Sequence, residues 1–218
     1  MTLTLRDRVL EFLPALIEFE DCHSTELFGK KNNKTLRQTL LHRKYAHLAS
    51  SVLEAYPGLL EQSLGDFLLE LKRRDDPFYL HFLNRYGDAR YCEFRLRDSN
   101  ILKLKGLYCF TVDGALKYIG KSNDSLSKRI NQGYGRIHPK NCYRDGQATN
   151  CHLNALIASS VEHIALLVCP MVNNKDIELT EKALIAKEKP DWNIQLKTYS
   201  VKNTSHVFAA DGAVAQGG

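Results

Sequence analysis

Hydrophobic positions in the first hundred residues recur at helical spacing. Apolar side chains three and four positions apart occur over 9–17 and, in a longer stretch, over 36–53. This spacing places apolar groups on one face of a helix. Two further helices are expected over 59–73 and 76–86, where Pro suits a helix start and Gly a helix end. The region is therefore predicted to be all-helical, apart from an alternating segment at 91–97 that favours a strand.

The pattern changes near residue 100. Residues 106–112 are apolar and aromatic, Asp113-Gly114 is a strong two-residue hairpin turn, and 115–119 form a returning strand. Asn123-Asp124 supplies capping side chains for a short helix over 125–131. An antiparallel hairpin followed by a helix is expected here.

The remaining pattern completes an α+β fold. Residues 136–151 are polar and lack periodicity, which predicts a long loop, and such loops in compact domains are often functional. A helix over 152–159, a buried strand over 163–171 and a last helix over 178–187 follow. The predicted architecture is a small antiparallel three-stranded sheet flanked by helices and preceded by the helical region.

This division predicts three parts: a helical N-terminal region over 1–100, a second domain over 101–197, and a partly disordered tail over 198–218. Of the 218 residues, 44% are hydrophobic and 25% charged, which allows a packed core. No apolar run reaches the roughly 18 residues of a membrane helix. The N-terminus lacks a basic-then-apolar signal segment, so a cytoplasmic protein is expected.

Charge and cysteine content restrict the possible partners and sites of the protein only slightly. The net charge of +5 is compatible with a polyanionic partner. The six cysteines are scattered and include no Cys-x-x-Cys pair. Small buried thiols are expected, in preference to a zinc site formed by Cys142, Cys151 and His152.

Residues that are candidates for catalysis or binding concentrate between positions 106 and 193. In chain order they are Gly106-Leu107-Tyr108, Tyr118-Ile119-Gly120-Lys121, Arg129, Tyr134, Glu181 and Pro190-Asp191-Trp192-Asn193. Arg129 presents a planar cationic fork that suits two phosphate oxygens. Glu181 is a single carboxylate, which suits Mg²⁺ better than zinc; Glu178, one helical turn earlier, is its competitor. Two tyrosines of a hairpin come close together if both lie on the same face of the sheet.

The motif order resembles that of the GIY-YIG nuclease family. Gly106-Leu107-Tyr108 stands where that family has Gly-Ile-Tyr, and Tyr118-Ile119-Gly120 matches its second motif. Lys121, Arg129 and the spacing from Glu181 to Asn193 also match, so the resemblance covers residues 105–195.

Two positions depart from the family pattern. Leu107 replaces Ile, which is conservative on a strand. Tyr134 lies five residues after Arg129, whereas the family often has four. Either the helix ends in a bulge, or Tyr134 is displaced from the site.

The resemblance implies a metal-dependent endonuclease that hydrolyses double-stranded DNA by attack of water. Glu181 would bind Mg²⁺ or Mn²⁺, and Tyr108 as a phenolate or Lys121 would be the general base. A free tyrosine has a pKa near 10, so a cationic neighbour must favour its ionised form. The implied catalytic set is Tyr108, Tyr118, Lys121, Arg129, Tyr134 and Glu181. The residues expected to contact DNA are Arg129, Lys140, Arg144, Gln147, Asn150 and Asn193; Thr149 and Asn154 belong to the same polar cluster, and Asn193 can alternatively close the loop after the last helix.

The order of domains favours a restriction-type or mobile-element enzyme. The core follows a helical region that would grip DNA or mediate dimerisation, and cutting both strands would require two subunits or two visits. The alternatives are a structure-specific repair nuclease, a catalytically inactive nucleic-acid-binding module, and a protein-interaction adaptor.

Overall fold

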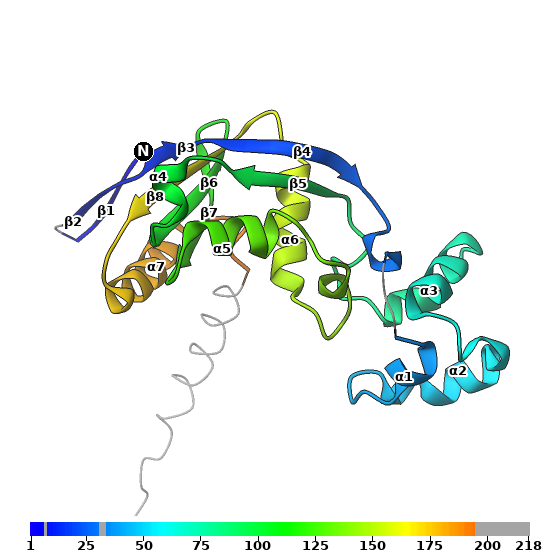
Figure 1. Ribbon diagram of the computed structural model, residues 1–218. Coiled ribbons are helices and arrows are strands. Elements are labelled where there is room, and N and C mark those ends of the chain that lie inside the picture. The colour runs from blue at the N-terminus through cyan, green and yellow to red at the C-terminus, as the bar shows by residue number, and fades with distance from the viewer. Residues whose placement is uncertain (7, 31–33, 195–218) are drawn as a thin grey trace, which may run out of the picture. The chain divides into compact units, whose positions relative to one another are not determined.

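The computed structural model describes residues 1–6, 8–30 and 34–194 and has the predicted α+β class. Its internal contacts divide the chain into two compact units (Figure 1). Of the described residues, the first unit takes in 1–6, 8–15, 103–125 and 164–194, and the second takes in 16–30, 34–102 and 126–163. The chain therefore passes between the units four times, and each unit is described separately below. The expected C-terminal tail at 198–218 lies outside the described residues.

A four-stranded antiparallel sheet forms the first unit. Its strand order is β3 (Leu13–Ala15), β8 (Ile164–Pro170), β6 (Gly106–Val112) and β7 (Ala115–Ser122). A hairpin of β1 (Thr2–Leu5) and β2 (Arg8–Glu11) and the long helix α7 (Asn174–Glu188) complete the unit. The expected three-stranded sheet was one strand too small, because β3 pairs with the free edge of β8.

Helix α7 covers one face of this sheet (Figure 1). Ile177, Leu184 and Ile185 of the helix pack in one buried cluster with Leu107 and Cys109 of β6 and with residues of β2, β7 and β8. Since side chains alternate between the faces of a strand, Tyr108 and Phe110 lie on the opposite face. The position of α7 therefore determines which side chains of the hairpin remain for other roles.

The central hairpin has the predicted two-residue turn. Asp113 and Gly114 both adopt left-handed backbone angles, with φ of 49° and 78°. These angles match a turn whose twist suits two antiparallel strands. At the other end of β6, Gly106 has φ 144°, and a Cβ there would lie 2.3 Å from the carbonyl oxygen of Cys169. Only glycine allows β6 and β8 to approach so closely.

The second unit combines a two-stranded ribbon with short helices. Strands β4 (Ile17–Ser24) and β5 (Tyr91–Leu96) pair antiparallel. The α-helices are α1 (Leu36–Leu40), α2 (Ala49–Ala55), α3 (Leu64–Arg73), α4 (Ser99–Leu102), α5 (Leu126–Arg129) and α6 (Ala148–Ala158). The 3₁₀ turns are η1 (Leu27–Gly29), η2 (Ala46–Leu48), η3 (Pro57–Leu59), η4 (Pro77–His81) and η6 (Pro139–Cys142), and η5 (Ile130–Tyr134) is a π-helical turn.

The prediction of an all-helical N-terminal region is wrong for its first part. Residues 2–24 form four strands. The apparent helical stripe included Val9, Leu13 and Leu16, which are 65%, 50% and 69% exposed. The buried positions Leu10 and Phe12 are two residues apart, the spacing of a strand. A short apolar segment satisfies both periods, and pairing of 13–15 with β8 selects the strand.

The long helix expected over 36–53 is broken into α1, η2 and α2. Tyr45 explains part of the break, because its buried ring stacks on Phe82 at 5.8 Å and its hydroxyl donates to Asp145. The expected fourth helix is the 3₁₀ turn η4. By contrast, the structure confirms β5, β6, β8 and α7 close to their predicted bounds.

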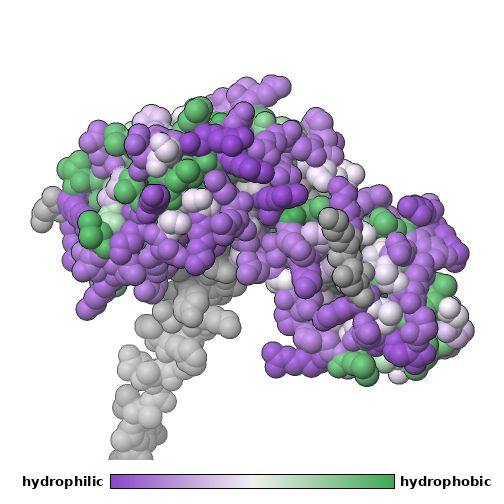
Figure 2. Space-filling model, viewed as in Figure 1, coloured by the Kyte–Doolittle hydropathy of each residue, from purple (hydrophilic) through white to green (hydrophobic). Residues whose placement is uncertain are grey.

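The burial of the cysteines agrees with the expectation of small buried thiols. Five of the six cysteines are buried, and all six are free thiols. Figure 2 shows one side of the surface, where hydrophilic side chains predominate and hydrophobic ones gather in separate patches. Within the described part of the chain, every helix is too short or too polar to cross a bilayer.

Candidate functional site

The two tyrosines of the hairpin share one face of the sheet. Tyr108 lies opposite Gly120, and Phe110 lies opposite Tyr118. The ring centroids of Tyr108 and Tyr118 are 6.0 Å apart, with an angle of 32° between the planes. The same-face arrangement expected from the sequence is therefore confirmed.

Gly120 provides the space that these rings occupy. A Cβ at this position would lie 2.5 Å from the hydroxyl oxygen of Tyr108 and 2.7 Å from Cε1 of Tyr118. The phenol of Tyr108 thus crosses the backbone of β7, which is the edge strand of the sheet.

Lys121 forms an ion pair with Glu181 of α7. Its Nζ lies 2.8 Å from Oε2 of Glu181, and the two side chains are 28% and 17% exposed. Alternation along β7 directs Lys121 to the face that α7 covers, opposite to the face of Tyr108. The phenol of Tyr108 and the carboxylate of Glu181 therefore lie on opposite faces of the hairpin, and the edge strand β7 separates the two faces.

Glu178, the competitor of Glu181, has a different environment. It lies on the exposed side of α7 and pairs with Lys182, whose Nζ is 2.9 Å from its Oε1. The hydrogen bond from Lys182 lowers the pKa of this carboxyl, and attraction to Lys182 and Lys121 adds to the effect. Of the two acids, Glu181 is the one directed at the hairpin.

Asn193 closes the loop after α7. Its Oδ1 accepts from the backbone N–H of Ile119 at 2.9 Å, and its Nδ2 donates to the carbonyl of Ile119 at 2.7 Å. The amide therefore pairs with the outer edge of β7 as a neighbouring strand would. Of the two roles considered from the sequence, this geometry matches loop closure.

Arg129 and Tyr134 belong to the second unit, where a π turn joins them. The N–H of Gly135 donates to the carbonyl of Ile130 at 2.7 Å, a bond between residues five apart. The guanidinium carbon of Arg129 lies 5.6 Å from the centroid of the Tyr134 ring. The extra residue between the two is thus absorbed by the π turn, which is the bulge that the sequence offered as one explanation of the spacing.

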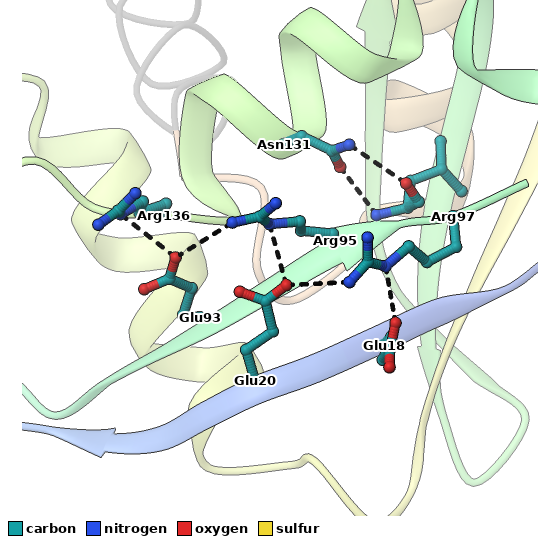
Figure 3. Close-up of polar contacts among 8 residues, drawn as sticks. Glu18, Glu20, Glu93, Arg95, Arg97, Asn131 and Arg136 are labelled. Atoms are coloured by element: carbon teal, nitrogen blue, oxygen red, sulfur yellow. Dashed lines mark hydrogen bonds and ion pairs between the residues drawn. The ribbon is translucent and has the colours of Figure 1, made fainter. Parts of the chain in front are cut away.

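The π turn is fixed to β5 by an asparagine that the sequence did not single out (Figure 3). Leu96 donates its N–H to Oδ1 of Asn131 at 2.8 Å, and Nδ2 of Asn131 donates to the Leu96 carbonyl at 3.2 Å. The N–H of Phe94 donates to the carbonyl of Gly135 at 2.9 Å. Asparagine is common in loops and turns, so its role here could be found only from coordinates.

Two amides of α6 support the same turn. Nδ2 of Asn154 donates to the carbonyl of Tyr134 at 2.6 Å, and Nδ2 of Asn150 donates to that of Gly133 at 3.1 Å. Both side chains are buried. The other residues of the predicted DNA-contacting loop, Lys140, Arg144 and Gln147, are exposed.

The outer face of the β4–β5 ribbon carries arginines paired with glutamates (Figure 3). The pairs are Arg95 with Glu20 at 3.0 Å, Arg97 with Glu18 at 2.6 Å and Arg136 with Glu93 at 3.2 Å. This face is rich in arginine, yet each of these cations has an acidic partner.

Among the described residues, no three His, Cys, Asp or Glu side chains gather as a ligand set. Comparison of the chain with protein-family models, curated proteins and solved structures finds no significant match.

Proposed function

We propose that the protein is a metal-dependent endonuclease of the GIY-YIG type that hydrolyses phosphodiester bonds of double-stranded DNA. The observation that carries the proposal is the hairpin itself, where Gly120 accommodates the phenol of Tyr108 on one face of β7 and the Lys121–Glu181 ion pair lies on the other face. Strands β6, β7 and β8 with α7 correspond to the core that the motif order predicts. A restriction-type or mobile-element role, with a homodimer for double-strand cutting, is part of the proposal.

The residues of this hairpin suit the steps of hydrolysis. Tyr108 as a phenolate, or Lys121 as a free amine, takes the proton of the attacking water. Tyr118 orients that water through its hydroxyl. Arg129 and Tyr134, which belong to the second unit, keep the role that the motif order implies: the guanidinium would hold the scissile phosphate and offset the charge that develops on it.

Glu181 fits the requirements of a divalent cation. It is a single, mostly shielded carboxylate, and Mg²⁺ commonly takes one or two carboxylates and completes its shell with water and phosphate oxygens. Bound there, Mg²⁺ or Mn²⁺ would supply Lewis-acid stabilisation of the leaving oxygen. Lys121 would then be released from its ion pair and become available to the phosphate.

One observation favours a second candidate, a catalytically inactive DNA-binding module. In the described structure the carboxylate of Glu181 is already neutralised by Lys121 at 2.8 Å. In such a module this ion pair would be a permanent structural contact.

Cleavage of plasmid DNA with Mg²⁺ tests the proposal. Glu181→Gln and Tyr108→Phe should each lower the cleavage rate by about a hundredfold or more, as expected for removal of a group that acts in the transition state. Glu178→Gln, one turn earlier on α7, is the matched control and should cleave as the wild type does. Duplex binding without metal should be unchanged in all three.

The outcomes separate the candidates. Loss of cleavage in the Glu181 and Tyr108 variants alone supports the nuclease. A wild-type protein that binds duplex DNA without cutting it in Mg²⁺ or Mn²⁺ supports the inactive module. Absence of both binding and cleavage would refute the two together.

A further inference from the structure

The second unit carries a group of exposed cations that differs from the arginine-rich face of β4–β5. It is formed by the turn between α1 and α2 and by the loop before α6, and we call it the basic surface. Its members are Arg43, Lys44, His47, Lys140 and Arg144, all exposed.

Hydrogen bonds hold the two segments together across about a hundred residues of sequence. Nζ of Lys44 donates to the carbonyl of Arg144 at 2.9 Å. The hydroxyl of Tyr45 donates to Oδ1 of Asp145 at 2.5 Å, and the N–H of Asp145 donates back to that hydroxyl at 3.3 Å. Burial raises the pKa of Tyr45, and the bond to Asp145 raises it further, so the phenol stays a donor at neutral pH. The turn and the loop therefore form one rigid surface.

The cations of this surface outnumber its acid Asp145, whose carboxylate accepts the Tyr45 hydroxyl. Within the described ranges, Arg43, Lys44, Lys140 and Arg144 make no ion pair with a carboxylate. Arg144 instead directs Nη1 at Nε2 of His47, 3.3 Å away. A guanidinium can only donate hydrogen bonds, so Nε2 of His47 is the acceptor in this contact. A surface that holds cations beside one another is complementary to a polyanion.

We infer that the basic surface binds the phosphate backbone of double-stranded DNA. The inference rests on the proposed function for its choice of duplex DNA among polyanions. Arg43 from the turn and Arg144 from the loop contact phosphates, and Lys140 adds a further cation from the loop. The inference adds the turn at 41–47 to the residues expected to contact DNA. From the sequence, this turn was predicted only as the middle of a helix.

Salt-dependent binding tests this inference. The double variant Arg43→Ala/Arg144→Ala removes two cations and leaves the Lys44 and Tyr45 bonds, and circular dichroism and thermal melting check its fold. Affinity for a short labelled duplex, measured by anisotropy without divalent metal, should fall roughly tenfold at low salt. The slope of log affinity against log salt should decrease by about 2, because each phosphate contact contributes about 0.9.

Two controls separate a local surface from net charge. Arg43→Lys/Arg144→Lys retains both charges and should keep most of the affinity and the slope. Lys175→Ala/Lys189→Ala removes the same charge from the ends of α7 and should leave the slope near the wild-type value. Equal losses in this control and in the Arg43/Arg144 variant would overturn the inference.

Other outcomes are equally decisive. If the Arg43/Arg144 variant binds duplex as the wild type does while the wild type cleaves DNA, the basic surface is wrong and the nuclease proposal stands. If binding depends on Arg43 and Arg144 but no cleavage occurs, the surface stands and the nuclease proposal fails. Binding of single-stranded RNA or an acidic peptide in preference to duplex DNA would overturn the choice of partner.

Discussion

Single polar side chains determine where the helical pattern of the second unit stops. Asp76 is an example, because it caps the turn η4 by accepting the N–H of Phe78 at 2.9 Å and also accepts the hydroxyl of Tyr56. The bond from Tyr56, followed by that from Phe78, lowers the pKa of Asp76. Burial first, and then Asp76, raises the pKa of Tyr56 to about 12. One carboxylate thus joins the end of α2 to the start of η4.

Replacement of the Asp76 carboxylate should lower the stability of the protein by more than its small size suggests. Asp76→Ala should lower the free energy of unfolding by about 1 to 2 kcal/mol, the usual cost of a lost N-cap. Asp76→Asn keeps an acceptor for Phe78 and should lose less. Urea unfolding of the three proteins at about pH 7 measures both values.

The pH dependence follows from the direction of the shifts. Because the pKa of Asp76 is lowered in the folded state, its contribution is present above the unfolded value of about 3.9 and is lost as the pH falls through the folded value. The raised pKa of Tyr56 acts at the other end: its contribution is complete below about pH 10 and is lost as the pH rises through about 12. The difference in unfolding free energy between wild type and Asp76→Ala should therefore shrink in acid; a constant difference down to about pH 2 would contradict this account.

Among the elements, the π turn at 130–134 shows how a local irregularity is maintained. A π turn is rarely stable without outside support. Here Asn131 supplies both a donor and an acceptor to Leu96, and the buried Asn150 and Asn154 bond to its carbonyls. The relation between Arg129 and Tyr134 therefore depends on asparagine side chains, of which Asn154 bonds directly to the Tyr134 carbonyl.

Loss of the Asn131 amide should weaken this support. In Asn131→Ala, the N–H and carbonyl of the buried Leu96 lose their partners, which should cost about 1 to 3 kcal/mol of stability. Hydrogen exchange at Leu96 should become faster. Asn131→Asp retains the acceptor and should protect the Leu96 amide better than alanine does. Gln132→Ala, an exposed change in the same turn, is the control, and equal exchange in all variants would argue against the role of Asn131.

The sequence predicted elements well where local signals and tertiary pairing agree. The hairpin at 106–122 combined apolar strands with Asp113-Gly114 and was found. The last helix was found too, although it begins at Asn174, four residues before its predicted start. Residues 9–17 failed because their apolar spacing fits two periods, and 36–53 failed because the buried Tyr45 interrupts a helical stripe. The Lys121–Glu181 pair and the Asn131 bonds link residues 60 and 35 apart in sequence, and no local pattern encodes such contacts.

At the level of the whole molecule, the two units share one interleaved chain. The sheet of the first unit needs three separate stretches, and β8 lies at its centre between β3 and β6. Helix α7 adds Ile177, Leu184 and Ile185 to the same core. Neither the hairpin nor the N-terminal strands can bury their apolar side chains without residues 164–188.

A chain ended after His163 should therefore lack the first unit. Backbone amides of β6 that bond to β8 should lose their protection from hydrogen exchange, whereas they are protected in the full-length protein. The measured quantity is the rate of hydrogen exchange at the backbone amides of residues 107–110. Wild-type protection of these amides in the shortened chain would contradict the central place of β8.

The central position of β8 also has a consequence for biosynthesis. As the polypeptide emerges from the ribosome, strands β3 and β6 are exposed long before their common partner is translated. The edge of β6 that pairs with β8 stays unpaired until about fifty further residues have been translated. Nascent chains in this state attract chaperones. Formation of the sheet around this hairpin thus waits for residues 164–170, and synonymous changes in decoding speed between codons 112 and 164 are the place to alter its yield.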